Sequence, residues 1–188
     1  MNYQPATLRI IRHEHLVDVI NSGHPIQINY DEGSTLTVDS TEFELAQYHF
    51  HVPSEHSIDG KSFPMEMHLV HVSEQGEIAV LGVLIQEGSH HSAFDPVVEH
   101  IPLDVGSEEH LEHVRVEIDD LLPDDDSTFR YSGSWTTPPC SEGVHWLVFV
   151  QPLELSSQQI QSFARVIRGN NRPRQPHNGR DLLLQRSP

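Results

Sequence analysis

The sequence is poor in cysteine and in long apolar runs, and both absences exclude classes of protein. Cys140 is the only cysteine among 188 residues, so an internal disulfide and a closed, cysteine-rich structural zinc site are excluded. No cysteine–histidine pair with an orienting group surrounds it, which argues against a catalytic thiol. The chain has neither an apolar run long enough to span a bilayer nor a signal-peptide pattern at Met1, so we expect no membrane insertion.

Basic residues are scarce as well. The chain has 11 lysine and arginine residues, with Lys61 as the only lysine, against 28 aspartate and glutamate residues, which gives a formal net charge of −17. Nucleic acids and anionic membrane surfaces are recognised by basic patches. The composition therefore argues against both as partners.

Length and composition fit one domain. A chain of 188 residues, 36% of them hydrophobic, is long enough to bury a sizeable core. It has no internal repeat, no low-complexity segment and no interior break typical of a linker. We therefore predict a single domain over residues 1–188.

The apolar patterning predicts a mostly β structure. Apolar or alternating segments, each bounded by glycine, proline or aspartate, predict strands at residues 26–30, 35–38, 46–51, 66–71, 78–85 and 144–150. Helices are few. The clearest one is predicted over 157–168, where Ser156 and Gln159 have capping-box spacing and Gly169 stops the helix. A shorter helix is predicted to begin at Asp95-Pro96.

Three histidines stand where a pair of strands can bring them together. His49 and His51 are two residues apart in a predicted strand, so their side chains point to the same face. His68 lies in the next predicted strand, and the prolines and the Asp-Gly pair between the two strands predict a turn that folds it back beside the first. This arrangement predicts a three-histidine metal site.

The type of site follows from its donors. Three imidazoles without a fourth protein ligand are typical of a catalytic zinc, which keeps one position for water. Gln47 and Glu66 each precede a candidate ligand by two positions on the same face, where they can accept an imidazole N–H. The alternative is a set of structural histidines, since 15 histidines produce accidental clusters. His71 has the opposite strand parity to His68, so we expect it to face away and to make structural hydrogen bonds.

A second polar segment runs from Ser132 to Cys140. It places two threonines, Thr136 and Thr137, directly before a proline pair. The rigid prolines can hold both hydroxyls in a fixed orientation toward a cleft. Taken alone, the segment reads as a turn between strands.

Together these segments give the chain a specific resemblance to a known family. It resembles the alpha-class carbonic anhydrases of bacterial type from about Leu8 to Leu183. The segments that carry the resemblance are residues 47–56 (QYHFHVPSEH), 65–71 (MEMHLVH), 79–82 (AVLG), 133–140 (GSWTTPPC) and 169–173 (GNNRP). The resemblance implies a mainly β (α+β) fold, with a large, twisted, mostly antiparallel sheet, a few short peripheral helices and a zinc ion at the bottom of a conical cleft.

The resemblance also implies roles for single residues. His49, His51 and His68 match the zinc ligands, and Gln47, Glu66 and Asn170 match the residues that hydrogen-bond to those ligands. Thr136 matches the threonine that orients the attacking hydroxide, Glu55 the carboxylate that orients this threonine, and His24 the histidine that passes protons to solvent. Six further positions match the substrate pocket: Val70, Val80, Trp135, Thr137, Val144 and Trp146. Trp135 stands where the family usually has leucine, which predicts a narrower pocket mouth.

The implied activity is the reversible hydration of carbon dioxide to bicarbonate and a proton, by attack of zinc-bound hydroxide. Zn²⁺ is the implied cofactor, and sulfonamides or anions are the implied inhibitors. The resemblance allows a homodimer, and it predicts a periplasmic or extracellular location. The family commonly pairs the cysteine matched by Cys140 with one nearer the N-terminus, which this chain lacks.

The main departure from the family is at the N-terminus. The family normally has some fifty residues before the segment matched by residues 3–10, so the domain is expected to be N-terminally truncated, with part of its sheet uncovered. Three functions remain open: an active zinc hydro-lyase, a truncated zinc-binding protein with little or no activity, and a catalytically silent binding module. A replaced ligand histidine would indicate the last, and none is replaced.

Overall fold

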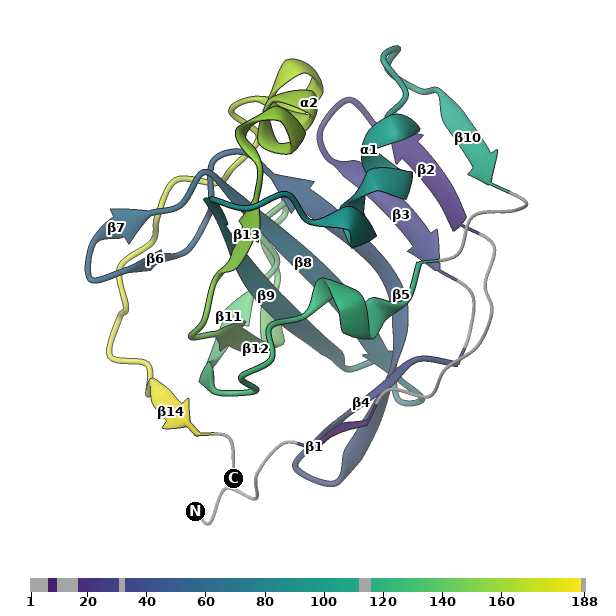
Figure 1. Cartoon of the computed structure of the whole chain (residues 1–188). Helices are drawn as coiled ribbons and strands as arrows, with labels where there is room; N and C mark the ends of the chain where they lie inside the picture. The colour runs from purple at the N-terminus through teal and green to yellow at the C-terminus, as the bar shows by residue number, and fades with distance from the viewer. Residues whose placement is uncertain (1–6, 10–16, 31–32, 112–115, 187–188) are drawn as a thin grey trace.

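In the computed structural model, residues 7–9, 17–30, 33–111 and 116–186 are described. Twelve strands within these ranges form one sheet, in which the main path runs β10-β2-β3-β5-β8-β9-β12-β11-β14 (Figure 1). Its strands are β1 (Thr7–Arg9), β2 (Val17–Asn21), β3 (Ile26–Tyr30), β4 (Thr35–Val38), β5 (Thr41–His51), β8 (Met65–Ser73), β9 (Ile78–Glu87), β10 (Glu108–Leu111), β11 (Thr128–Ser134), β12 (Glu142–Phe149), β13 (Leu153–Leu155) and β14 (Leu183–Gln185).

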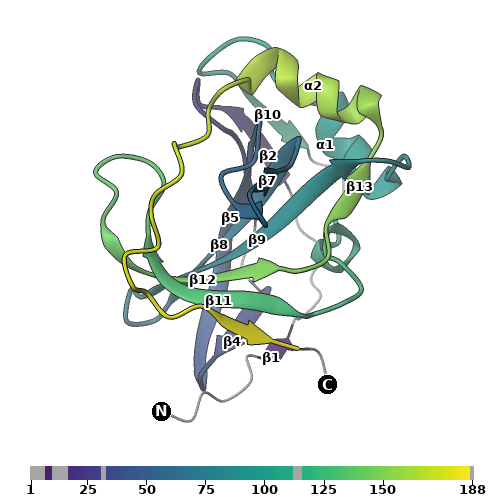
Figure 2. The same cartoon turned by 90° about the vertical axis from the view of Figure 1, so that its left-hand side faces the viewer.

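The sheet is mixed but mostly antiparallel. Only β12 and β13 pair with β9 in parallel; the other described pairs are antiparallel. A separate hairpin of β6 (Ser57–Ile58) and β7 (Lys61–Ser62) joins β5 to β8. The sheet ends at β14, which lies outside β11 (Figure 2). Leu184 in this strand and Leu182 just before it are exposed. The predicted fold class is confirmed.

The strands predicted from the apolar pattern are present. The expected segments 26–30 and 35–38 are β3 and β4 with the same bounds, while β5, β8 and β9 extend beyond the predicted ranges and β12 ends one residue early, at Phe149. The missed strands include β10 and β14, which lie at the ends of the path. An edge strand pairs through its main chain on one side only, so it needs no apolar alternation.

Two short helices cover one end of the sheet (Figures 1 and 2). The first, α1 (Asp95–Glu99), follows the 3₁₀ turn η1 (Ser92–Phe94); the second, α2 (Ser157–Ile167), begins with the predicted capping box of Ser156 and Gln159. A further 3₁₀ turn, η2 (Ile118–Leu121), follows β10. None of the helices in the described ranges is long and apolar enough to cross a membrane.

The alternation of β5 separates the core from the candidate site. Tyr48 and Phe50 point into the main core, where the Phe50 ring lies 4.4 Å from that of Phe163 in α2. His49 and His51 therefore point to the opposite face of the strand. There, a smaller apolar cluster of β8, β9 and β12 side chains is built around Trp146. The alternation of β5 thus directs Tyr48 and Phe50 into the main core and His49 and His51 to the side of the Trp146 cluster.

Candidate metal centre

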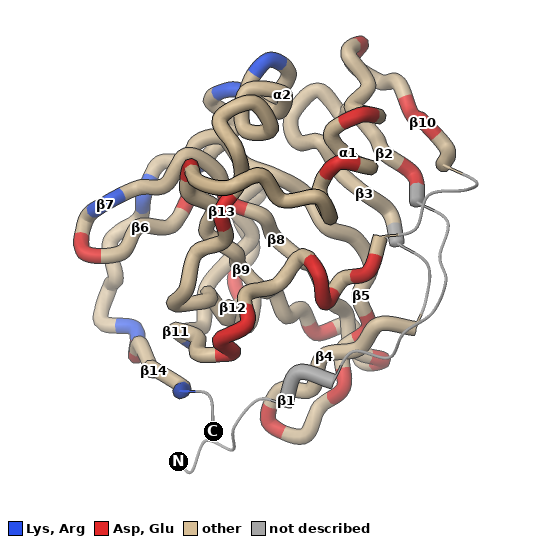
Figure 3. The backbone as a smooth tube through the Cα atoms, viewed as in Figure 1, with Lys and Arg blue, Asp and Glu red and all other residues tan. Residues whose placement is uncertain are grey.

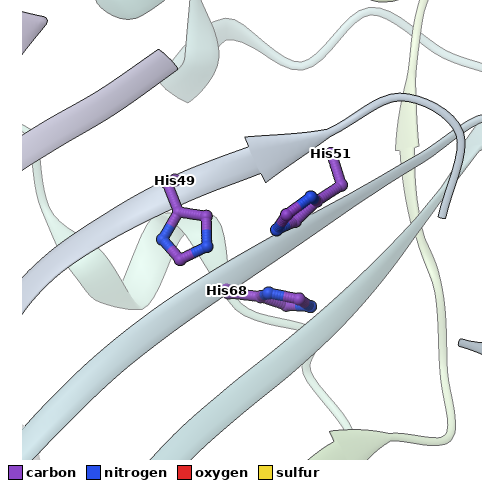
Figure 4. Close-up of side chains that lie close together, drawn as sticks. All are labelled: His49, His51 and His68. Carbon is purple, nitrogen blue, oxygen red and sulfur yellow. The ribbon is translucent and has the colours of Figure 1, made fainter. Parts of the chain in front are cut away.

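His49, His51 and His68 converge on one point of the sheet. His49 in β5 is the antiparallel partner of His68 in β8, and His51 is two residues further along β5. One ring nitrogen from each lies within 4.8 Å of the others. The ring centroids are 4.6 to 5.3 Å apart, and Figure 4 shows the rings around a common space. The strand pairing expected from the sequence thus creates a cluster with room for one small cation.

Each of the three imidazoles has an acceptor on the side away from this space. The acceptor is Gln47 Oε1 for His49 Nδ1 (2.9 Å), Glu66 Oε1 for His68 Nε2 (2.8 Å) and the main-chain oxygen of Asn170 for His51 Nδ1 (3.4 Å). Such acceptors fix which ring nitrogen carries the proton and leave the other one for a metal. His51 Nε2 is buried and has no hydrogen-bond partner. A buried nitrogen without a partner is suited to bind a metal ion.

The environment keeps these imidazoles neutral, which metal binding requires. Burial, followed by the charges of His68 and His51, holds the pKa of His49 well below its usual range. Burial lowers the pKa of His51 to about 4 and also lowers that of His68, against the opposing charge of Glu66. At neutral pH all three rings therefore offer a lone pair.

Glu66 is the charged centre behind the cluster. Glu66 is fully buried. Gly82, the β9 partner of His68, leaves room for the Glu66 carboxylate, because a Cβ atom at position 82 would lie only 3.2 Å from Glu66 Oε1. Burial alone would raise the pKa of this carboxyl, but the adjacent His56 and His68 hold it well below its usual range. Its Oε2 also accepts the main-chain N–H groups of Glu55 and His56, both at 2.8 Å. A carboxylate so occupied acts as a hydrogen-bond acceptor for the histidines.

His56 and Tyr131 extend this network, and no sequence pattern predicted the pair. His56 Nδ1 lies 2.5 Å from Glu66 Oε1, and His56 Nε2 lies 2.6 Å from the Tyr131 hydroxyl. Burial opposes protonation of His56, but Glu66 outweighs it and raises the pKa. His56, Glu66 and His68 form a second group of possible metal ligands. The close contacts with Glu66 identify that group as a hydrogen-bonded, charged cluster.

Glu55 and Thr136 line the same cavity. Glu55 is buried; its Oε1 accepts the main-chain N–H of Arg172 at 2.6 Å, while its Oε2 is buried without a hydrogen-bond partner. Thr136 is half-buried two residues after β11, in the segment that leads to the cis Pro138–Pro139 bond. The structure does not contain the hydrogen bond expected between the two side chains. It does leave a buried acceptor that needs a donor.

The expected substrate pocket corresponds in part to one apolar cluster. Val70, Val80, Val144 and Trp146 are buried together, and the Trp146 ring lies 4.8 Å from the His68 ring. Trp135 is half-buried and packs against this cluster. The other expected pocket residue, Thr137, is half-buried outside the cluster, and its main-chain oxygen accepts the N–H of Cys140. An apolar wall therefore adjoins the three histidines.

His24 lies on the exposed turn between β2 and β3. Asn170 fixes this turn, because its Nδ2 donates to the main-chain oxygen of His24 at 3.0 Å while its own main-chain oxygen faces His51. The charge of His24 also contributes to the lowered pKa values of His49 and His51. The turn is thus close to the histidine cluster and open to solvent.

Comparisons with known proteins agree with this geometry. The family model of eukaryotic-type carbonic anhydrases matches residues 1–186. The chain is 41% identical to a carbonic anhydrase of Nostoc sp. over 97% of its own length and 66% of that protein, and 41% identical to one of Pectobacterium carotovorum, of which it covers 75%. It therefore spans about two thirds to three quarters of these relatives.

Solved structures give the same result. The alpha-carbonic anhydrase of Thermovibrio ammonificans, determined with the inhibitor sulfanilamide, superposes with a TM-score of 0.91 at 39% identity and covers 97% of this chain and 80% of its own. That of Photobacterium profundum superposes with a TM-score of 0.90 at 38% identity, covering 97% and 83%. By fold, by sequence and by the arrangement of its histidines, the chain belongs to the eukaryotic-type carbonic anhydrases, the alpha class.

Proposed function

We propose that the chain catalyses the reversible hydration of carbon dioxide to bicarbonate and a proton, with a zinc ion held by His49, His51 and His68. The observation that carries the proposal is the convergence of three neutral imidazoles, two of them buried and that of His49 half-buried, and one ring nitrogen among them, His51 Nε2, has no hydrogen-bond partner. Three histidines with a free fourth position are the ligand set of a catalytic zinc. Family membership supports the reaction, and the donor set supports the metal.

A zinc ion in this site supplies a Lewis acid that makes hydroxide available near neutral pH, chemistry for which carbonic anhydrases themselves are the standard example. The chain's own contribution begins with orientation. Gln47, Glu66 and Asn170 hold the three rings in one tautomer each, so a free nitrogen of each ring faces the shared space. Such acceptors also make the imidazoles better donors.

The apolar wall is suited to carbon dioxide. Val70, Val80, Val144 and Trp146 offer an apolar surface next to His68 and exclude water from it. Carbon dioxide carries no charge and no proton to donate, so a hydrocarbon surface is sufficient to hold it. Bicarbonate is charged and is disfavoured there. The wall therefore favours binding of the substrate and release of the product.

Glu55 and Thr136 are assigned the orientation of the attacking oxygen. Glu55 Oε2 needs a donor, and the Thr136 hydroxyl is the side-chain donor that we assign to it. When the hydroxyl donates its proton to the carboxylate, its oxygen is left to accept a hydrogen bond from hydroxide. This directs a lone pair of the hydroxide toward the carbon atom of carbon dioxide.

His24 is assigned the transfer of protons to solvent. A histidine has an ordinary pKa near the working pH, which suits repeated gain and loss of a proton. The assignment is supported by its exposed position and by the hydrogen bond from Asn170 to its main-chain oxygen, because the main-chain oxygen of Asn170 also faces His51. We further propose that the chain binds sulfonamides, as the Thermovibrio relative binds sulfanilamide.

The proposal is tested by stopped-flow measurement of carbon dioxide hydration on the purified 188-residue chain. A zinc-dependent rate that sulfanilamide inhibits is the expected result. Zinc binding with no rate above the buffer blank would show a zinc-binding protein without activity. Absence of zinc binding would indicate a silent binding module.

A further inference from the structure

Three of the few arginines in this acidic chain gather around one cavity. The cavity measures about 350 Å³ and is lined by Arg172, Arg174 and Arg180, together with Tyr131, Leu182 and Glu55. We call it the arginine cavity. Figure 3 shows basic segments from β7 to β14 on this side, whereas acidic residues predominate around β4, β5 and β10. The cavity is therefore a local exception to a formal net charge of −17.

The charges of these three arginines are not neutralised within the described ranges. Arg130 shows the contrast, since it pairs with Asp39 at 2.8 Å. The guanidinium groups around the cavity instead donate to neutral oxygens: Arg172 to Ser134 Oγ (3.1 Å), Arg174 to Ser57 Oγ (3.2 Å) and Arg180 to the main-chain oxygens of His177 and Pro176 (both 3.0 Å). No ion pair within 4.0 Å joins any of the three to a described carboxylate.

Neutral acceptors hold an arginine in place without cancelling its charge. Each guanidinium has five N–H donors, and the contacts above use one or two of them on each side chain. The remaining donors can bind an oxyanion in the forked geometry that carboxylates fit. Arg172 and Arg180 are half-buried, and the Arg180 guanidinium lies 5.7 Å from the centre of the Tyr131 ring. These positions are set before any ligand arrives, which lowers the entropic cost of binding.

The other charged groups of the cavity define where an anion can lie. Glu55 is at the inner end, where it accepts the main-chain N–H of Arg172 and would repel an anion. His56, also in the lining, is hydrogen-bonded to Tyr131 and Glu66, and His177 lies at the exposed rim. The positive charge without an ionic partner therefore lies on the exposed Arg174 and on the half-buried Arg172 and Arg180.

We propose that the arginine cavity is a binding site for a small polycarboxylate, separate from the three-histidine cluster. Two or more carboxylates match the number of unpaired guanidinium groups, and Leu182, Pro173 and the Tyr131 ring provide apolar contact for a carbon chain. A volume of about 350 Å³ exceeds what an inorganic ion fills and lies at the lower end of small-molecule sites. None of His49, His51 and His68 lines the cavity, although Glu55 and Thr136, which we assign to the orientation of the attacking oxygen, line part of it.

The test is calorimetric titration of the zinc-loaded and zinc-free chain with succinate, a dicarboxylate that binds zinc weakly, and in parallel with inorganic phosphate. We expect succinate to bind equally in both forms and more tightly than phosphate, and to weaken as sodium chloride is raised. Arg174→Gln and Arg180→Gln should each weaken binding about tenfold, the loss expected for one charge-assisted contact. The matched control is Arg165→Gln, an exposed arginine in α2 outside the cavity.

The double variant Arg174→Lys/Arg180→Lys keeps both positive charges but loses the paired N–H donors of the guanidinium groups. It should therefore retain only part of the affinity for succinate. The carbon dioxide hydration rate of the double glutamine variant should match that of the parent chain, because Arg174 and Arg180 have no part in the proposed reaction. Three results would overturn the proposal. Succinate could bind as tightly after both glutamine substitutions, its binding could weaken equally in Arg165→Gln, or it could bind only to the zinc-loaded chain. Stronger binding of phosphate than of succinate would contradict the polycarboxylate class.

Discussion

Glu66 Oε1 lies 2.8 Å from His68 Nε2, two residues away on the same face of β8, and both side chains are buried. The carboxylate fixes the proton on Nε2 and so leaves Nδ1 of His68 free. A buried carboxylate also depends on its hydrogen-bond donors, here two histidines and the main-chain N–H groups of Glu55 and His56, to offset the cost of its burial. The orientation of one candidate ligand therefore depends on a residue that does not itself need to touch the metal.

Replacing Glu66 with glutamine should weaken zinc binding about 10- to 100-fold, the range observed when a partner of a metal-binding histidine is lost. The amide keeps the size of the side chain but removes the charge, and it can present an N–H where His68 needs an acceptor. Competition with a chromophoric chelator measures the affinity. The exposed Glu77→Gln variant is the matched control. Equal affinities for all three proteins would remove Glu66 from the metal centre.

Replacing Thr136 with alanine should lower the hydration rate by roughly 10²-fold while zinc stays bound, as expected when one orienting hydrogen bond is lost. Glu55→Ala should have a similar effect, because it removes the acceptor that directs the threonine proton. Thr136→Ser keeps the hydroxyl and should keep most of the rate. Stopped-flow rates and zinc content are measured on the same samples. An unchanged rate in Thr136→Ala would refute the orienting role.

Replacing His24 with alanine should lower the maximal rate in dilute buffer, where proton export limits turnover. Small imidazole-type buffers at high concentration should restore much of the rate, because a dissolved base can replace a side chain as proton acceptor. A loss that no buffer rescues would make His24 structural. An unchanged rate would show that water alone exports the proton through the open turn.

His71 should make the zinc-free protein sensitive to acid. Burial lowers the pKa of His71 to about 4, whereas the unfolded chain has the ordinary value of 6.5. The unfolded state therefore binds the proton first, and the free energy of unfolding falls as pH drops from about 6.5 to about 4. The loss attributable to this group is about 3 kcal/mol. Above pH 6.5 the group contributes no pH dependence.

His71→Phe should remove that share of the acid sensitivity. Urea unfolding of the zinc-free parent and variant between pH 4 and 7 gives the two curves, and the difference between them isolates His71 from the other buried histidines. The parent should lose more stability than the variant over this range. Parallel curves would show that His71 titrates in the folded protein as it does in the unfolded chain.

The part of the site that lies on regular strands could be predicted from the sequence. The period of two in β5 placed His49 and His51 on one face, and the same rule faced His71 away, where its Nδ1 now lies 3.0 Å from the main-chain oxygen of Leu69. Gln47 followed the same parity. Backbone alternation is a local property, so a sequence reveals it without knowledge of the rest of the fold.

The remaining parts depend on contacts between distant segments. His56 follows β5 in a turn, where no parity rule applies, and its partner Tyr131 lies 75 positions later in β11. Asn170 reaches His51 through its main-chain oxygen, which any residue could supply, so only family resemblance identified it. The arginine cavity requires the segment after α2 to pass beside β11 and the turn after β5. That proximity is set by the tertiary fold and not by a local pattern.

The most direct test of the three-histidine zinc site and its activity is to measure zinc stoichiometry and carbon dioxide hydration in parallel in the parent chain, His51→Ala and His71→Gln. The parent and His71→Gln should each hold about one zinc and show a rate that disappears when the metal is removed and returns when zinc is added back. His51→Ala should have neither tight zinc nor hydration activity. Stoichiometric zinc with full activity in His51→Ala would contradict the account.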